Sequence, residues 1–450
     1  MQIYLPYIIS FFIGFFLLNI LLKKKSKPSL SLHIFLAAGV GLGISSTIAF
    51  FSFVFFNGLN KTFIQHANHG LLALFFLLNV RRWIKYRFKD RRSIISDIQH
   101  VLAIGVIIAV SLPLWEHAHF YLFGGWDAWS TWNFKAKMLL LSEDWKKIFD
   151  PILWRSSPHY PLLLPLTNVW GWIYQPQLTQ QTTVLTSYFF TISSFGLLFA
   201  ALQEYTKKFI YVICSIVLLT SPFIIKLSLS QYCDHVHGYY ILGTVVCLIF
   251  AKTKSSRSYA FLAGLLAGLA SFTKSEGLIS SLILMTLSSP FILWKNPSEQ
   301  KYKVVAHFIL GALLGYIPAM IFYAFYAPEN LTMINGLTSS EKPSTFFRLK
   351  MIVSFYLVEI VSPKWEGLLI AFLAGLLLSV KRCFRPSYII IPIFLASYWS
   401  VITAFYFINT YFKIDWWLQV SLDRIIFALV PTIFLWVMLS LGQVKTVEGK

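Results

Sequence analysis

Charge is scarce in this chain. Of its 450 residues, 12% are Asp, Glu, Lys or Arg, whereas 57% are hydrophobic. Soluble domains carry about 25% charged residues, so this composition excludes a soluble globular protein and indicates a polytopic membrane protein. Acidic residues are the scarcest, 18 against 38 basic ones. Because basic residues of membrane proteins gather in cytoplasmic loops and beside anionic headgroups, we interpret the excess as a topology signal and not as a nucleic-acid-binding surface.

Cysteine is also scarce, and we expect no leader sequence. The chain has four cysteines and no CxxC pair, which argues against a disulfide framework or a structural zinc site. The N-terminus has neither a basic leader nor a small-residue cleavage site. Its first apolar run is instead followed by Lys23, Lys24 and Lys25, the reverse of the order in a signal peptide. We therefore expect residues 3–22 to form a retained helix.

Long apolar runs fill most of the sequence. Since a spanning helix needs about 20 apolar residues, we expect an all-α bundle of about 11–13 transmembrane helices. The pair 258–272 and 277–294 is short, and it is either two spans or one re-entrant unit. The expected spans are 3–22, 32–56, 68–84, 97–115, 180–202, 208–227, 236–251, 258–272, 277–294, 304–326, 364–380, 387–408 and 421–441.

The dense basic clusters indicate the orientation. With the N-terminus outside and the C-terminus cytoplasmic, nearly all of them fall in inner loops. The long loops 116–179 and 327–363 then lie outside, and the first carries interfacial helices. We expect an N-terminal group of three helices at 1–96 and a second membrane domain at 97–445, in a bacterial inner or plasma membrane. The clusters are 23–27, 81–92, 207–208, 252–257, 295–303 and 381–385.

The stretch GGWDAWSTWNFKAK at 124–137 places a lone acid, Asp127, among indoles directly after an expected span. A carboxylate desolvated by indoles has a raised proton affinity, which suits a general base. The alternative is a membrane-anchoring helix with an incidental aspartate. The residues expected to share one stripe of that helix are Trp126, Trp129 and Trp132, while Lys135 and Lys137 continue the helix and can reach lipid phosphate.

Two further outer segments carry polar residues. The run SSPHYPLLLP returns His159 and Tyr160 toward the membrane, and this histidine can also be purely structural. The run QYCDHVHGYY opens a helix with Asp234, either as its N-cap or as a second carboxylate facing the outer loop. His235 and His237 beside it offer a metal site as an alternative interpretation, although the spacing is no strong ligand signature.

Two cations are also expected near the outer face of the bundle. In SFTKSEG, Lys274 and Glu276 lie between two short apolar segments, where a charge is costly and tends to be functional. The alternative is a hairpin turn with an internal Lys–Glu pair. Arg424 lies about one turn into the last apolar run and can bind phosphate bidentately, or pair with Asp423 to close the bundle.

The order of these motifs resembles the GT-C superfamily of integral membrane glycosyltransferases, nearest to the protein O-mannosyltransferase and lipid A aminoarabinose transferase type. WDAWSTWNFKAK with HYPLLLP resembles the family's first outer loop with its acidic residue, and SQYCDHVHGYYILG its later outer aspartate. GLLAGLASFTKSEGL is similar to its Gly-rich helix ending in a Thr-Lys turn, and DRIIFALVP to its Arg-containing helix. The resemblance covers about residues 97–440.

The resemblance implies inverting transfer of a sugar from a polyprenyl-phosphate donor to a hydroxyl of a protein, lipid or glycan at the extracytoplasmic face. It implies no required cofactor, with a divalent metal optional. Competing interpretations are a transporter or flippase of a lipid-linked or anionic substrate, and a non-enzymatic scaffold. The implied roles are Asp127 as general base with Asp234 as the second catalytic residue, Lys274, Arg424 and Lys137 on the donor phosphate, and His159, Tyr160, Glu276, Trp126 and Trp129 orienting substrates.

Overall fold

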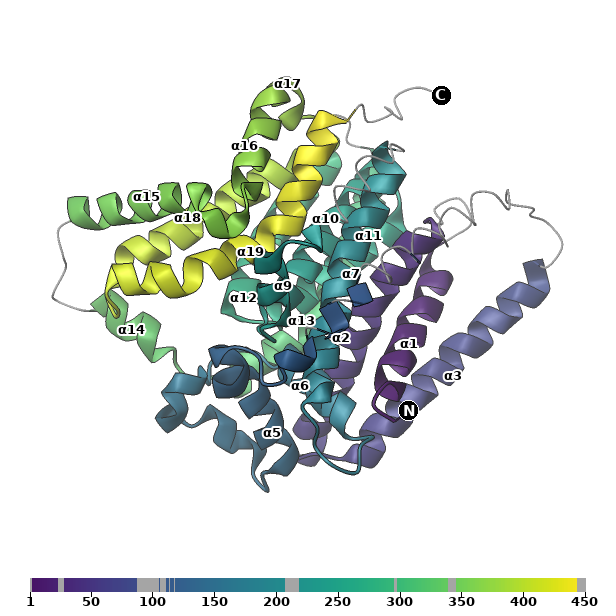
Figure 1. Ribbon diagram of the computed structural model, residues 1–450. Coiled ribbons are helices and arrows are strands. Elements are labelled where there is room, and N and C mark those ends of the chain that lie inside the picture. The colour runs from purple at the N-terminus through teal and green to yellow at the C-terminus, as the bar shows by residue number, and fades with distance from the viewer. Residues whose placement is uncertain are drawn as a thin grey trace.

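The protein is an all-α bundle, seen in a computed structural model (Figure 1). Within the described residues every regular element is a helix. Eight helices are long and apolar enough to cross a membrane, which confirms the expected class of multi-pass membrane protein. The structure describes residues 2–22, 28–86, 105, 111–112, 114–116, 118–206, 218–294, 298–338 and 345–442.

Eleven of the described helices coincide with expected spans, although three of them, of 17, 15 and 11 residues, are too short to count among the eight long ones. Segments 97–115 and 208–227 fall largely outside the described residues, although α9 (Pro222–Leu229) covers the end of the second. The short pair forms two separate helices, α11 (Arg257–Ser271) and α12 (Ser275–Leu293). The other helices of this set are α1 (Leu5–Leu21), α2 (Leu30–Phe56), α3 (Lys61–Tyr86), α7 (Gln181–Thr206), α10 (Asp234–Thr253), α13 (Glu299–Phe325), α16 (Leu368–Leu378), α18 (Ile390–Ile408) and α19 (Ile414–Leu441).

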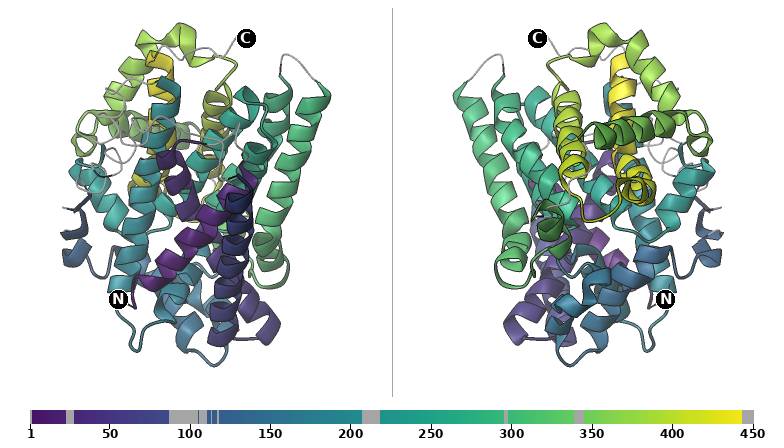
Figure 2. Two further views of the ribbon diagram at one scale, coloured as in Figure 1. Left: turned by 90° about the vertical axis from the view of Figure 1, so that its right-hand side faces the viewer. Right: turned by 90° about the vertical axis from the view of Figure 1, so that its left-hand side faces the viewer.

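Both long loops contain helices of their own. Those of the first loop gather at one end of the bundle, drawn in blue at the bottom of Figures 1 and 2. In the second loop, α15 lies across the axis of the bundle (Figure 1). These helices are η2 (Ala128–Trp132), α5 (Asn133–Leu141), η3 (Trp145–Phe149), η4 (Pro151–Ser156) and α6 (Leu163–Trp172), then α14 (Leu331–Thr338), α15 (Thr345–Val361) and η5 (Pro363–Trp365).

The N-terminal helices pack into the rest of the bundle. The indole N–H of Trp170 in α6 donates to the Pro6 carbonyl at 3.0 Å and to the Ser10 hydroxyl at 2.9 Å, both in or next to the first turns of α1. The Tyr239 hydroxyl of α10 donates to the Phe35 carbonyl of α2 at 2.7 Å. The expected domain boundary at residues 96 and 97 lies outside the described residues.

Described members of the basic clusters lie at the other end of the bundle. Lys254, after α10, pairs with Glu204 at the end of α7 at 3.8 Å, and Ser258 bonds to the last carbonyl of α1. The short helix α17 (Val380–Cys383) carries two basic residues beside the last residues of α19, where Arg382 donates to the Leu441 carbonyl at 3.1 Å. These cluster members therefore share one end, as the alternation of spans predicts.

Glycines allow α11 and α13 to pack in backbone contact. Each helix carries a Gly-xxx-Gly pair, Gly264 with Gly268 and Gly311 with Gly315. A side-chain carbon on any of the four would overlap the backbone of the facing helix, including the Phe261 carbonyl oxygen opposite Gly311. Such small-residue pairs permit the close van der Waals contact that stabilises helix association in lipid.

We expect Gly311→Ala to lower the free energy of unfolding by about 1–3 kcal/mol, because the added methyl group forces α11 and α13 apart. Gly70→Ala in α3 is the matched control, since nothing lies within 4 Å of the added carbon there. The control should be neutral or slightly stabilising, because alanine favours helix over glycine. Thermal unfolding of both variants in detergent checks this, and equal stability would contradict the packing described.

Candidate functional site

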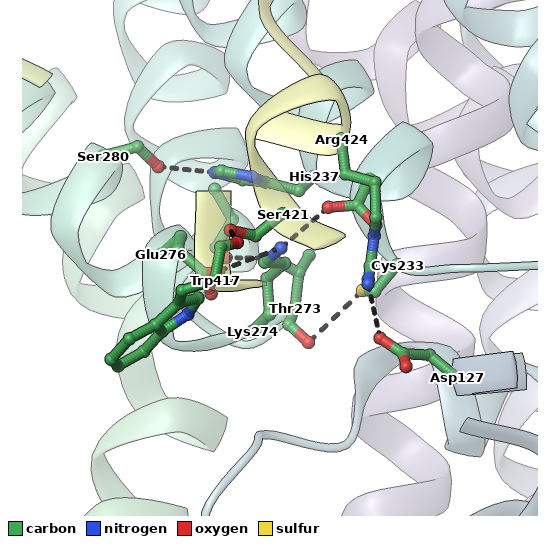
Figure 3. Close-up of polar contacts among 12 residues, drawn as sticks. Asp127, Cys233, His237, Thr273, Lys274, Glu276, Ser280, Trp417, Ser421 and Arg424 are labelled. Carbon is green, nitrogen blue, oxygen red and sulfur yellow. Dashed lines mark hydrogen bonds and ion pairs between the residues drawn. The ribbon is translucent and has the colours of Figure 1, made fainter. Parts of the chain in front are cut away.

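Arg424 of α19 joins two carboxylates from distant parts of the chain. Its Nη1 lies 2.6 Å from Oδ2 of Asp127 at the start of η2 (Figure 3). Its Nε and Nη2 both donate to Oδ2 of Asp234, at 3.1 and 3.0 Å. The face of the guanidinium lies over the Tyr232 ring at 4.2 Å, a cation–π contact. The guanidinium is therefore held from two edges and one face.

Lys274, the residue before α12, completes the group. Its ammonium donates to Oδ1 of Asp234 at 2.8 Å and pairs with Oε1 of Glu276 at 3.1 Å. Both acids lie in the first turn of a helix, where the macrodipole favours negative charge. Asp234 is thus engaged through both oxygens and does not cap its own helix. We call Asp127, Asp234, Lys274, Glu276 and Arg424 the ionic network.

The ionic network is graded in exposure and carries a net charge. The side chains of Asp234 and Lys274 are 3% and 6% exposed, while those of Arg424, Glu276 and Asp127 are 19%, 22% and 30% exposed. Three carboxylates face two cations, so the ionised network has a charge of −1. One oxygen of Glu276, Oε2, is buried without a hydrogen-bond partner among the described residues. The network is thus closed at Asp234 and open toward Asp127 and Glu276.

Close helix packing brings Arg424 to Asp234. One turn further along each helix, Gly238 of α10 faces Ala428 of α19, and a side-chain carbon on Gly238 would lie 2.5 Å from the Ala428 carbonyl oxygen. The two helices therefore run in the same direction at the network. Figure 1 shows that α19 bends along its length. Pro431 lies inside this helix and removes the hydrogen bond to the carbonyl of Phe427, which accounts for the bend.

Two glycines bring the first loop to Arg424. Gly124 has a φ of +67°, and a side-chain carbon there would lie 2.6 Å from the Ser230 carbonyl oxygen. The next residue, Gly125, donates its N–H to that oxygen at 3.0 Å. Gln231 donates to the Tyr121 and Leu122 carbonyls at 3.0 and 3.1 Å. The GG pair thus lets the loop lie directly against the segment that precedes α10.

The expected stripe of indoles is only partly present. Trp126 and Trp129 are 62% and 50% exposed and contact each other edge to face, with 4.3 Å between ring centroids. Trp132 is fully buried and stacks on Tyr160 at 5.4 Å. The prediction of a single stripe was wrong because η2 is a π-helix, whose wider turn changes the angle between successive side chains.

Lys135 does not reach the lipid, contrary to expectation. It is fully buried, and its ammonium donates to the carbonyls of Ser157 at 2.6 Å and Tyr160 at 3.0 Å. Burial lowers the pKa of Lys135 to about 7, and the nearby Cys233 thiol opposes this shift. Burial and then Lys135 lower the pKa of His159 to about 3, so the ring is neutral. Lys135 therefore joins α5 to the Pro-rich segment of the same loop.

Tyr160 lies within electrostatic range of the ionic network. The carboxylate of Glu276 and then burial raise the pKa of this phenol, and Lys274 opposes the shift. His159 contacts the Tyr160 ring edge to face at 4.8 Å. Of these two predicted orienting residues, Tyr160 lies near the charges of the network, and His159 packs against its ring.

The depressed pKa of Lys135 predicts a pH-dependent stability. Between about pH 7 and 10.5 the unfolded chain binds this proton and the folded chain does not, so the free energy of unfolding rises with pH, by about 2 kcal/mol from pH 7 to 9. Lys135→Met should lack this rise, whereas Lys146→Met, at an exposed position of the same loop, should keep it. Denaturant unfolding at pH 7 and at pH 9 gives the free energy of unfolding of each protein. An equal change in this free energy between the two pH values for all three proteins would contradict the burial of a neutral amine.

The remaining predicted residues lie apart from the network. Lys137 is half-buried and forms no described ion pair. Ser187 contacts the His235 ring at 3.4 Å, and His237 bonds to Ser280 at 2.8 Å (Figure 3). Among the described residues, no group of three His, Cys, Asp or Glu side chains is arranged to hold a metal ion. The alternative in which Asp234, His235 and His237 form a metal site is therefore not supported.

Sequence reasoning missed a second ionic cluster beside the first. Lys364 pairs with Glu359 at 2.8 Å and with Asp423 at 3.6 Å, while the Trp365 indole donates to Glu359 at 2.6 Å. Asp423 thus pairs with Lys364, and the alternative in which it neutralises Arg424 was wrong. The charges within 359–366 are the available sequence signal for this cluster, although nothing in their spacing connects them to α19.

Two open depressions flank the first loop. The larger, about 820 Å³, lies between the α2–α3 turn and the end of α5. The smaller, about 430 Å³, is lined by η3, the start of η4 and the end of α13. Neither is lined by a residue of the ionic network, so neither offers a groove for a polyprenyl chain beside it.

Comparison with known proteins adds no assignment: no protein-family model, no curated protein and no solved structure matches this chain. The resemblance to GT-C glycosyltransferases therefore stays a prediction.

Proposed function

We propose that the protein is a membrane glycosyltransferase that moves a sugar from a polyprenyl-phosphate donor to an acceptor hydroxyl. One observation carries the proposal: residues 127, 234, 274 and 424 come from four separate elements and meet in one ionic network. Charges at membrane depth are costly and are retained for function. A carboxylate beside paired cations is what transfer from a lipid phosphate requires.

Asp127 is the general base in this proposal. Its carboxylate takes the proton of the acceptor hydroxyl while the hydroxyl oxygen forms a bond to the anomeric carbon. The bond from that carbon to the phosphate oxygen breaks, and its electron pair stays on the polyprenyl phosphate. Attack from the face opposite the phosphate inverts the anomeric centre. Asp127 is the most exposed acid of the network, at 30%, so an acceptor from solvent can reach it.

Arg424 stabilises the leaving phosphate by direct contact, and Lys274 stabilises it by its positive charge at longer range. Negative charge grows on the phosphate as the glycosidic bond breaks, and fixed cations in a dry site are worth more there than in water. Asp234 holds both cations in place through its two oxygens. Asp234 is therefore a positioning residue in this proposal, and the chemistry needs no cofactor. Lys137, though outside the network, lies on the same loop and can approach the phosphate when donor is bound.

Glu276 and Tyr160 are the candidates for orienting substrate hydroxyls. The buried Oε2 of Glu276, which has no described partner, can accept a hydrogen bond from a hydroxyl that enters the network, and the Tyr160 hydroxyl can donate one. Trp126 and Trp129 present exposed indoles next to Asp127, where rings suit either a sugar face or the lipid boundary. The basic residues at the opposite end support an extracytoplasmic site.

The test uses purified protein in lipid nanodiscs with polyprenyl-phosphate sugars and a panel of acceptors. We expect consumption of one donor, release of free polyprenyl phosphate and sugar on the acceptor. A transporter or flippase would move the donor across a vesicle membrane without consuming it. A scaffold would do neither, and either of these results would refute the proposal.

A further inference from the structure

Both cations of the ionic network are already paired with carboxylates, and this restricts where a phosphate can bind. Lys274 contacts two carboxylates, and Asp234 accepts from three N–H donors in a pocket where its side chain is 3% exposed. Displacing Asp234 would leave a buried carboxylate without its three N–H donors. A phosphate therefore cannot enter at Lys274 or at the Nε edge of Arg424 without dismantling the buried half of the network.

The Nη1 edge of Arg424 is different. Its partner, Asp127, forms one described ion pair, comes from a loop helix, and regains water readily because it is 30% exposed. An ion pair that is partly exposed contributes little to stability, about 0–1 kcal/mol. A phosphate oxygen makes the same charge-assisted bond to a guanidinium as a carboxylate oxygen does, and can add a second one.

The net charge of the ionic network also favours phosphate binding in place of the Asp127 carboxylate. The ionised network already carries −1, since three acids face two bases. Adding a phosphate while Asp127 stays in place would put two anions on one edge of Arg424. If the phosphodiester of the donor, which carries one negative charge, takes the place of the Asp127 carboxylate, the charge beside Arg424 is unchanged and the carboxylate turns toward solvent.

We propose that the Nη1 edge of Arg424 is a phosphate subsite and that Asp127 occupies it in the resting protein as a built-in anion. Phosphate binding exchanges the partner of Arg424 and releases Asp127. This deepens the proposed function, on which its catalytic meaning rests: the general base becomes free only when donor phosphate is in place. The binding statement itself holds for any phosphate-bearing ligand.

The proposal predicts that removing the competing anion strengthens phosphate binding. Asp127→Asn should bind a short-chain polyprenyl monophosphate about two- to fivefold more tightly than the wild type, measured by titration in detergent. Glu143→Gln, at an exposed acid of the same loop, is the matched control and should not change the affinity. The corresponding polyprenol, which lacks phosphate, should bind all three proteins equally.

A second arm uses inorganic phosphate to separate lipid phosphate from free phosphate as the source. A gain for Asp127→Asn with either probe supports the subsite, and the probe bound more tightly identifies the source. Unchanged or weaker binding of both probes to Asp127→Asn, or an equal gain for polyprenol, would overturn it. Failure of the proposed function is distinguishable: phosphate affinity would then rise in Asp127→Asn although the wild type transfers no sugar.

Discussion

Replacing Asp127 by Asn is expected to lower the rate of sugar transfer by about 10²–10⁴-fold, because the amide cannot accept the acceptor's proton. The substitution keeps the size of the side chain and removes one partly exposed ion pair, so the protein should fold. Turnover is measured as release of free polyprenyl phosphate by nanodisc-reconstituted protein.

A control variant and a stability measurement separate loss of the base from loss of the fold. Glu143→Gln removes an exposed carboxylate from the same loop and should leave turnover unchanged. Thermal unfolding should show that Asp127→Asn is destabilised by no more than about 1 kcal/mol. Turnover of the folded Asp127→Asn protein within threefold of the wild type would remove Asp127 from the role of base.

Lys274→Met should produce the largest loss of stability in the bundle, about 3–5 kcal/mol. It removes a cation from a network that already holds one excess negative charge, so that Arg424 is left as the single cation of a network with three carboxylates. Burial amplifies the effect, since the Lys274 side chain is 6% exposed and water screens it poorly. Denaturant or thermal unfolding in detergent measures the loss.

Lys364→Met provides a matched control for that substitution. Lys364 also bridges two acids, Glu359 and Asp423, but its side chain is 33% exposed. We expect a loss below about 1 kcal/mol there. The double variant Lys274→Met with Asp234→Asn should recover part of the loss, because removing both partners leaves less uncompensated charge. Equal effects of the two lysine substitutions would show that burial does not govern these ion pairs.

The sequence alone predicted the class of fold and the meeting of distant residues. Apolar run length defined the spans, because a bilayer imposes about 20 residues on each one. Counting spans then placed Asp127, Asp234, Lys274 and Arg424 at one end of the bundle, and the structure brings them into contact. Polar residues are so rare in this chain that their positions carried most of the information.

Other features of the site depend on local geometry that spacing does not reveal. A π-helical turn at 128–132 turns Trp132 inward, although three-residue spacing favours a continuous stripe. Lys135 follows the pattern of a surface lysine, yet two carbonyls hold it in the interior. The pairing of Asp423 with Lys364 instead of its neighbour Arg424 follows from the position of η5, which no motif encodes. The roles of all these residues stay predictions.

We propose that this protein adds a sugar to a molecule outside the membrane. The most direct measurement is mass spectrometry of extracytoplasmic glycoconjugates from cells that carry the gene, lack it, or carry the Asp127→Asn variant. We predict that one sugar modification is present in the first and absent from the other two, with the variant protein at normal abundance. Identical glycoconjugates in all three would contradict the claim.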